Sequence, residues 1–318
     1  MNISVIIPSY NEQDSLIELS NEIIDSLKDS DLKFELIFID DGSTDNSWNI
    51  INNIVSNVKV YDTFEVRAIK FKKNFGKSLA LDAGFRSSKG DVVITMDADL
   101  QDDPKEILPL YDMIVKDKYD IVSGWKKTRL DPLSKTIPTK LYNWATRKVS
   151  GINLHDFNCG LKAYSSDLAE DLSLSGEMHR YIPLIAKNLG YARIGEKVVN
   201  HRMRIHGTTK YGGWNRFSNG LLDLISITFL NKFGKTPMHF FGLLGIFSFV
   251  FGFIIALYLT IMKIIFLQFN MTDRPLFFLS IIFMIIGSQL FLTGFLAELI
   301  IQNSDDSKKN IISKKIGF

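Results

Sequence analysis

Residues 91–104 read DVVITMDADLQDDP, a stretch that joins a strand pattern directly to a cluster of acids. The first half is apolar and partly β-branched, which is typical of a strand buried inside a parallel sheet. Four carboxylates follow within seven positions, namely those of Asp97, Asp99, Asp102 and Asp103. Like charges at this spacing repel one another, so the sequence predicts that a cation belongs among them.

The acidic stretch is part of a regular alternation of strand-like and helix-like segments within residues 1–125. The candidate strands are residues 3–8, 34–40, 65–71, 91–97 and 119–125. Between them, residues 12–28 and 44–55 have apolar side chains at helical spacing. This alternation predicts an α/β fold, with a mostly parallel sheet and helices on both faces. Ligands of such sheets bind beyond the carboxyl ends of the strands, where the polar clusters of this sequence lie.

Two uncharged segments near the C-terminus predict a pair of membrane-spanning helices. Residues 240–262 and 276–297 contain no charged side chain, and each exceeds the roughly 20 residues that a helix needs to cross a bilayer. The alternative is a pair of buried helices in a large soluble domain, but such helices rarely remain apolar on every face. The short connector predicts a hairpin within residues 236–302, formed by helices at about 238–264 and 275–301.

The basic residues predict how the hairpin is oriented. Lysines precede the first span and follow the second, whereas the connector has only Lys263 and Arg274. This bias places residues 1–212 and the tail, residues 303–318, in the cytoplasm, with the hairpin in a bacterial inner membrane. The N-terminus lacks the basic leader of a signal peptide. Residues 213–235 read as an amphipathic helix at the membrane interface, and an ordinary packed helix is the alternative.

Composition narrows the possible partners. The net charge of +2 excludes a generally basic nucleic-acid binder. The single cysteine, Cys159, excludes an intramolecular disulfide and fits a reducing compartment. Membrane lipids are expected partners of the hairpin, and a homo-oligomer remains possible for a membrane protein of this size.

The acids predict a nucleotide site that has no glycine-rich loop. Glycine is missing from PSYNEQDS after the first strand, which excludes the dinucleotide fingerprint. NFGKS at residues 74–78 is not a P-loop, because position 71 is Phe where that motif requires glycine. Carboxylates can face a nucleotide diphosphate only through a cation. Asp97 and Asp99 lie on one side of an extended chain and are predicted to hold Mg²⁺ or Mn²⁺, with phosphate oxygens and water.

The segments after the first two strands are predicted to line the same crevice. They are Ser9–Glu12 and residues 40–45. A tight turn at Gly42 would present Asp40 and Asp41 outward, where Asp40 is placed to accept a hydrogen bond from a nucleotide base. A turn followed by a helix N-cap is the structural interpretation of the same residues.

Six motifs together resemble the polyprenyl-phosphate glycosyltransferases of glycosyltransferase family 2, a group similar to dolichyl-phosphate mannose synthase. The motifs are VIIPSYNE (5–12), IDDGSTD (39–45), NFGKSLALDAGF (74–85), GDVVITMDADLQDDP (90–104), FNCGLKAY (157–164) and RIHGTTKYG (204–212). The resemblance implies a GT-A fold and the two-helix hairpin of the bacterial branch. It also implies inverting transfer of a sugar from a UDP- or GDP-sugar to undecaprenyl phosphate, for the modification of cell-surface glycans.

The resemblance implies roles for individual residues. Those around the nucleotide are Pro8, Tyr10, Glu12, Asp40, Asp41, Lys77, Asp97 and Ala98. Those at the metal are Asp97 and Asp99, with Gln101 completing the shell. Those predicted at the lipid phosphate are Lys126, Arg129, Ser134, Arg202, Arg204 and Lys210, of which Arg129, Arg202 and Lys210 match the family's motifs. Generic membrane-surface charge is the alternative for these cations. The catalytic candidates are Asp99, Asp102 and Asp156. Asp156 is interpreted as a catalytic base. The alternative is that its carboxylate holds an arginine or caps a turn.

Two further observations refine the hypothesis. Asp103 stands where the family often has proline, and an N-cap before Pro104 explains it. The sequence lacks the Q-x-x-R-W motif of processive synthases, which favours a single transfer per acceptor. Transfer to another lipid such as diacylglycerol, and a catalytically silent membrane scaffold, remain as alternatives. The motifs do not identify the donor sugar.

Overall fold

The computed structural model describes residues 1–57, 63–127, 140, 143–144, 146–148, 150–203, 229, 233, 236–266, 271–302 and 312–316. The chain forms two compact units. The first comprises residues 1–227 together with 310–318, and the second comprises residues 228–309.

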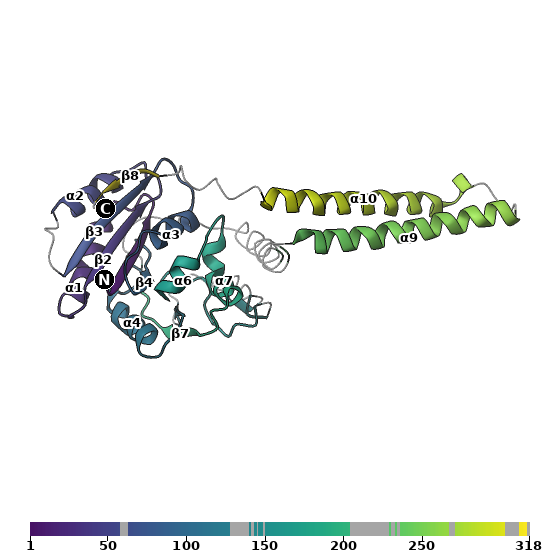
Figure 1. Ribbon diagram of the computed structural model, residues 1–318. Coiled ribbons are helices and arrows are strands. Elements are labelled where there is room, and N and C mark those ends of the chain that lie inside the picture. The colour runs from purple at the N-terminus through teal and green to yellow at the C-terminus, as the bar shows by residue number, and fades with distance from the viewer. Residues whose placement is uncertain are drawn as a thin grey trace. The chain divides into compact units, whose positions relative to one another are not determined.

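In the described part of the first unit, eight strands form one sheet (Figure 1). The strands are β1 (Ile3–Ser9), β2 (Phe34–Asp40), β3 (Phe64–Phe71), β4 (Val92–Thr95), β5 (Ile121–Trp125), β6 (Lys162–Ser165), β7 (Ile194–Val198) and β8 (Ile312–Ile316). Their order is β7-β5-β6-β4-β1-β2-β3-β8. Strands β4, β1, β2 and β3 are mutually parallel, whereas β6 and β8 run antiparallel to their neighbours.

Helices cover both faces of this sheet. One face packs against α1 (Leu16–Leu27), α2 (Ser47–Asn57) and α4 (Ile107–Val115), which follows the short 3-10 helix η1 (Pro104–Glu106). The other packs against α3 (Lys77–Phe85), α6 (Ser166–Asp171) and α7 (Ile182–Leu189), which follows η2 (Met178–Tyr181). Because side chains alternate along a strand, Val5 and Ile7 join the first core and Ile6 joins the second. The predicted α/β architecture is therefore confirmed.

All five predicted strands are present, but several details differ from the predicted pattern. Strand β4 ends at Thr95, so the acids after it lie in a loop. Strand β5 does not pair with β4, because β6 inserts between them in the antiparallel direction. The sequence analysis missed β6, which has only four residues and contains Lys162. The predicted helices are also shorter at their N-terminal ends than the patterns indicated.

The order of the strands fixes where a ligand can bind. The chain runs from β1 outward through β2 and β3, and then returns to place β4 on the other side of β1. This reversal opens a crevice at the carboxyl ends of β1 and β4. Residues 9–12 and 97–103 leave the sheet at those ends. The acidic loop is therefore at the topological switch point.

The end of the chain belongs to the first unit. Residues 303–318 were predicted only to be a tail, yet β8 pairs antiparallel with β3, with Ala68 opposite Ile316 and Lys70 opposite Lys314. The chain thus leaves the first unit for the second and returns to the edge of the same sheet. This pairing satisfies backbone groups on the outer side of β3 and makes the short strand β8 the edge of the sheet.

A buried ion pair stabilises the amino ends of the strands. Arg67 on β3 donates to Glu35 on β2, and both side chains are almost fully buried. Glu35 also accepts from the Ser4 hydroxyl at 2.5 Å and from the Lys89 N–H at 2.7 Å, while Arg67 donates to the Ser87 carbonyl at 2.6 Å. Because these contacts compensate both charges, the cluster has a structural role. It lies at the amino ends of the strands, away from the crevice.

The second unit is a helical hairpin of α9 (Pro237–Phe266) and α10 (Pro275–Gln302), with the 3-10 turn η3 (Met271–Asp273) after α9 (Figure 1). The helices approach closely where glycine replaces a side chain. A Cβ added to Gly245 would lie 2.6 Å from the Gly287 carbonyl oxygen, and one at Gly252 would lie 2.6 Å from that of Ser280. Small residues of this kind allow helix backbones to pack in contact.

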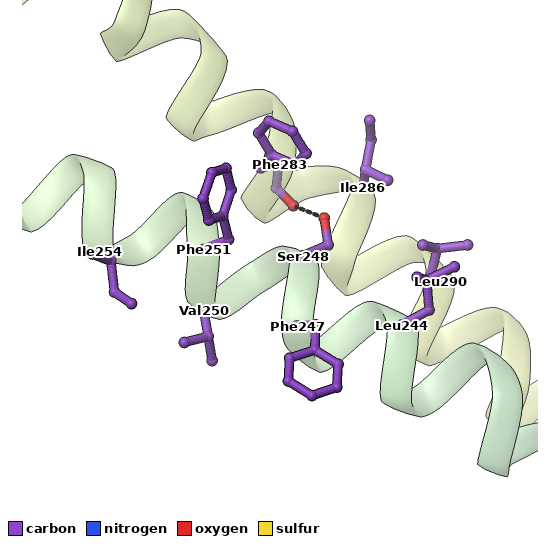
Figure 2. Close-up of a pocket in the computed structure, with 9 residues that line it drawn as sticks. All are labelled: Leu244, Phe247, Ser248, Val250, Phe251, Ile254, Phe283, Ile286 and Leu290. Carbon is purple, nitrogen blue, oxygen red and sulfur yellow. Dashed lines mark hydrogen bonds between the residues drawn. The ribbon is translucent and has the colours of Figure 1, made fainter.

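The outer surface of the hairpin is apolar. Both helices are long and apolar enough to cross a membrane, as predicted. Phe247 and Ile264 are among many large side chains that are more than half exposed, which contradicts the alternative of helices buried in a soluble core. Figure 2 shows a groove between the helices, where the Ser248 hydroxyl donates to the Phe283 carbonyl at 2.9 Å. That hydrogen bond satisfies the polar group in an otherwise apolar surface.

Candidate active site

The acidic loop begins one residue after β4 ends. Residues 98–100 form a turn, in which Leu100 has a φ of 60°. The expectation that Asp97 and Asp99 lie on one side of an extended chain is therefore wrong. Asp99 Oδ1 accepts from the Gln101 N–H at 3.3 Å within this turn. Both carboxylates remain partly exposed, whereas Ala98 between them is buried.

Basic residues from other elements pair with the acids of the loop. Lys77, the first residue of α3, forms an ion pair with Asp97. Lys126 forms one with Asp102 at 2.8 Å, and this pair is almost fully buried. Arg202 contacts Asp103 at 2.8 Å. The crowding of acids is thus tolerated in this structure because separate cations neutralise three of them.

Asp103 also has the capping role that the sequence suggested. Its side chain accepts from the Lys105 N–H at 3.1 Å at the start of η1, with Pro104 in the next position. Asn200 donates to the other oxygen at 3.1 Å. Together with Arg202, these contacts hold the pKa of Asp103 below its ordinary value against the effect of burial.

Three lysines lower the pKa of the Asp97 carboxyl group. Burial by itself would raise the pKa of its carboxyl group, but Lys77, followed by Lys126 and Lys162, lowers the pKa to about 2. The sequence analysis missed Lys162, whose buried ammonium donates to the Cys159 carbonyl. Its place in the motif FNCGLKAY was the signal that could have identified it. Strand β6 places it opposite Thr95, next to the acidic loop.

The motif FNCG packs directly behind Asp97. A Cβ on Gly160 would overlap the Asp97 carboxylate, so only glycine leaves the space that this side chain occupies. The adjacent Cys159 is buried beneath Gly124 of β5. Burial raises the pKa of the Cys159 thiol to about 12.

This environment makes Cys159 a probe of folding. Because the thiolate is the reactive form and the thiol stays protonated up to about pH 12, we expect no maleimide labelling of the folded protein at pH 8. Complete labelling is expected in denaturant, where the pKa returns to its ordinary value. Mass spectrometry of the intact chain measures both states, since the protein has one cysteine. Rapid labelling of the folded protein would contradict the buried position.

The loops that follow β1 and β2 are hydrogen-bonded to each other, so the two segments predicted to line one crevice are adjacent. The Asn11 side chain accepts from the Thr44 N–H at 2.8 Å, and the Asn11 N–H donates to the Ser43 hydroxyl at 2.9 Å. The Glu12 N–H donates to the Ser47 hydroxyl at 2.9 Å. Pro8, on β1 beside Ile39 of β2, and Tyr10 precede these contacts. The predicted nucleotide residues of both loops therefore share one region.

Asp40 and Asp41 do not point outward as expected. The turn is present, with a φ of 70° at Gly42, but both side chains are buried. Asp41 accepts from the N–H groups of Phe75 and Gly76, at 2.7 and 2.9 Å, which fixes the loop before α3. Asp40 accepts from the Ser43 N–H at 3.2 Å and has Lys70 at 3.9 Å. Burial raises the pKa of both carboxyl groups.

Asp156 has the turn-capping contacts of its structural alternative. Its Oδ1 accepts from the Asn158 N–H at 3.1 Å, and its N–H donates to Glu196 at 3.0 Å. The residue is buried, and its carbonyl also accepts from the Ser123 hydroxyl of β5 at 3.2 Å. Its role as a catalytic base stays a prediction.

Two of the predicted lipid-phosphate residues are ion-paired with acids. Lys126 forms an ion pair with Asp102. Arg202 forms ion pairs with Asp103 at 2.8 Å and with Glu22 of α1 at 2.6 Å. The Arg202 N–H also donates to the Gln101 carbonyl at 2.9 Å. These contacts tie residues 200–202 to the acidic loop. Arg129, Ser134, Arg204, Lys210 and most of the predicted helix 213–235 lie outside the described residues.

The loop can accommodate a hard divalent cation. In the described parts of the chain, no three His, Cys, Asp or Glu side chains group as a closed metal site. Mg²⁺ commonly uses one or two protein carboxylates and completes its shell with substrate phosphates and water. Asp97 and Asp99 are two partly exposed carboxylates on either side of Ala98, and Lys77 pairs with Asp97 in this structure. The donor set therefore fits Mg²⁺ or Mn²⁺ that arrives with a phosphate ligand.

Solved structures share this fold. Glucosyl-3-phosphoglycerate synthase from Mycobacterium tuberculosis, in complex with UDP, aligns with a TM-score of 0.52 at 20% identity, over 72% of this chain and 79% of that one. The same enzyme in complex with Mg²⁺ and UDP aligns with a TM-score of 0.52 at 21% identity, over 70% and 79%. This likeness confirms the predicted GT-A fold.

Sequence relatives cover nearly the whole chain. Dodecaprenyl-phosphate galacturonate synthase of Rhizobium johnstonii is 33% identical over 99% of this chain and 93% of its own. Undecaprenyl-phosphate 4-deoxy-4-formamido-L-arabinose transferase of Pseudomonas paraeruginosa is 32% identical over 93% and 84%. The model of glycosyl transferase family 2 matches residues 4–173. With its acid-bearing loop at the switch point of the sheet, the chain belongs to glycosyl transferase family 2.

Proposed function

We propose that the protein transfers a sugar from a nucleotide-sugar donor, a UDP- or GDP-sugar, to a polyprenyl phosphate such as undecaprenyl phosphate. The observation that supports this most strongly is the similarity to a dodecaprenyl-phosphate sugar synthase over 99% of the chain. That similarity includes the hairpin as well as the sheet domain. A lipid acceptor gives both parts of the chain a role in one reaction.

The hairpin brings the site to its acceptor. It spans the inner membrane, with the first unit on the cytoplasmic face. Pairing of β8 with β3 supports the hairpin topology, because the chain must return to the face from which it left. The lysines around both outer ends support the cytoplasmic orientation.

The chemistry requires two anions to meet. The second pKa of a phosphate monoester is about 6, so the attacking oxygen is largely deprotonated at neutral pH and needs no strong base. Asp97 and Asp99 would hold a divalent cation, which would supply positive charge next to the departing nucleoside diphosphate. The lysines and arginines near the acidic loop offset the repulsion between the acceptor phosphate and the donor diphosphate. Direct attack of that phosphate on the anomeric carbon inverts its configuration.

A donor screen tests this function. The purified full-length protein is mixed with undecaprenyl phosphate, Mg²⁺ or Mn²⁺ and one labelled nucleotide-sugar at a time. Donors of the sugars named in the two relatives, galacturonic acid and 4-deoxy-4-formamido-L-arabinose, come first. One donor is expected to give a chloroform-extractable product that mild acid hydrolyses, and NMR of its anomeric proton reports inversion.

Parallel reactions separate the alternatives. Diacylglycerol in place of the polyprenyl phosphate tests the second acceptor class, and only a phosphate-free glycolipid product would favour it. A failure of every donor with either acceptor would contradict the transferase function and favour the silent scaffold. The Asp99→Ala variant supplies the background rate for both reactions.

A further inference from the structure

We propose that Lys77 is a resident counter-ion of the metal-binding aspartate, and that it moves from Asp97 to the donor diphosphate when cation and donor bind. The ammonium group and a divalent cation then compete for one carboxylate in the donor-free protein. Binding of cation and donor is therefore synergistic. The inference rests on the proposed function only in requiring a nucleoside diphosphate donor.

The contact between Lys77 and Asp97 is the first observation behind this proposal. The two residues form an ion pair, and each side chain is about one-third exposed, at 32% and 31%. The pair is therefore accessible to a ligand entering the crevice. Asp97 thus already has a cation in contact with it before any metal arrives.

The backbone of Lys77 is anchored, whereas its side chain is long and flexible. The preceding N–H groups, those of Phe75 and Gly76, are held by Asp41. The next residue, Ser78, accepts from the His179 N–H at 3.0 Å and lies 2.9 Å from its ring Nδ1. Lys77 therefore pivots about a fixed Cα at the start of α3. Its four-carbon stem can carry the ammonium between two nearby anions.

The neighbouring lysines are held differently. The Lys126 side chain is almost fully buried and pairs with Asp102. The Lys162 side chain is buried and donates to the Cys159 carbonyl. Among the lysines paired here with described acids of the loop, Lys77 is the most exposed. Once a divalent cation binds Asp97, the ammonium and the cation repel each other. A diphosphate then offers Lys77 a new anionic partner.

Manganese binding without donor tests the exchange. Free Mn²⁺ is measured by electron paramagnetic resonance while the detergent-purified full-length protein is titrated, first alone and then with saturating UDP. GDP replaces UDP in every measurement if the wild type binds GDP and not UDP. We expect Lys77→Met to bind Mn²⁺ on the order of tenfold more tightly than wild type when UDP is absent. With Mn²⁺ present, the same variant is expected to bind UDP on the order of tenfold more weakly, because the lysine is missing from the diphosphate.

Two further variants control for charge and for folding. Lys72→Met removes the same charge from an exposed position five residues earlier and is expected to behave as wild type. Lys77→Arg retains a competing cation, so its Mn²⁺ affinity without UDP should stay near that of wild type. If the methionine variant unfolds, Lys77→Gln replaces it in the Mn²⁺ titrations. The increase in wild-type Mn²⁺ affinity caused by UDP is a second test that needs no variant.

Unchanged or weaker Mn²⁺ binding by a folded Lys77→Met protein without UDP would overturn the inference. So would a wild-type protein whose Mn²⁺ affinity does not increase with UDP. Neither result depends on the acceptor or the sugar, so both leave the proposed function standing. Conversely, a failed donor screen with the expected Mn²⁺ competition would overturn the proposed function alone.

Discussion

Replacing Asp99 with alanine is expected to lower the rate of sugar transfer on the order of a thousandfold, while the protein stays folded and in the membrane. The substitution removes one of the two carboxylates predicted to hold the divalent cation, so charge on the departing diphosphate is no longer neutralised. The fold should tolerate it, because Asp99 is partly exposed and its hydrogen bond to Gln101 is long, at 3.3 Å. Initial rates of lipid-linked sugar formation measure the loss.

The control for this variant is Asp112→Ala. Asp112 is an exposed acid on α4 that pairs with Lys116 at 2.8 Å, so its removal changes the net charge equally without touching the acidic loop. Wild-type rates are expected for the control. Higher Mg²⁺ or Mn²⁺ concentration should not restore Asp99→Ala to the wild-type rate. Near-normal metal-dependent turnover of this variant would refute the assignment of Asp99 to the metal.

Breaking the buried pair of Glu35 and Arg67 is expected to have the largest effect on stability. Glu35→Gln leaves the Arg67 guanidinium buried without a counter-charge, which costs about 3–5 kcal/mol. For a unit of this size, that corresponds to a decrease of roughly 6–20 °C in the unfolding midpoint. Tryptophan fluorescence measures it selectively, because Trp48, Trp125, Trp144 and Trp214 all lie in residues 1–227.

A double variant separates the charge from the packing. Glu35→Leu combined with Arg67→Met removes both charges and is expected to recover most of the stability lost in either single variant. Asp25→Asn breaks an exposed pair with Lys28 and should not shift the midpoint measurably. A midpoint of Glu35→Gln equal to that of wild type would show that this pair does not stabilise the first unit.

Much of the candidate site could be predicted because the motifs follow strands. Apolar periodicity located β1, β2 and β4, and the rule for the carboxyl ends of parallel strands then brought Asp97 together with the segments after β1 and β2. The burial of Asp41 could not be predicted. Its partners, the N–H groups of Phe75 and Gly76, lie beyond the whole of α2 and β3 in the sequence.

Lys162 shows a second limit of sequence analysis. It enters the site only because β6 inserts beside β4 in the antiparallel direction, which brings its first residue to the carboxyl end of β4. A four-residue strand has too little periodicity to reveal its pairing partner. The same limit applies to β8, because nothing in residues 312–316 specifies that they pair with β3.

The sequence by itself determined the α/β alternation, the two long apolar helices and the chemical character of DVVITMDADLQDDP. These properties depend on side chains close together along the chain, which is why periodicity and composition reveal them. Only the tertiary structure decided which cation neutralises which acid: Lys77 faces Asp97, Lys126 faces Asp102 and Arg202 faces Asp103. Ion pairing depends on distance in space, and strand order sets that distance for residues far apart in the sequence.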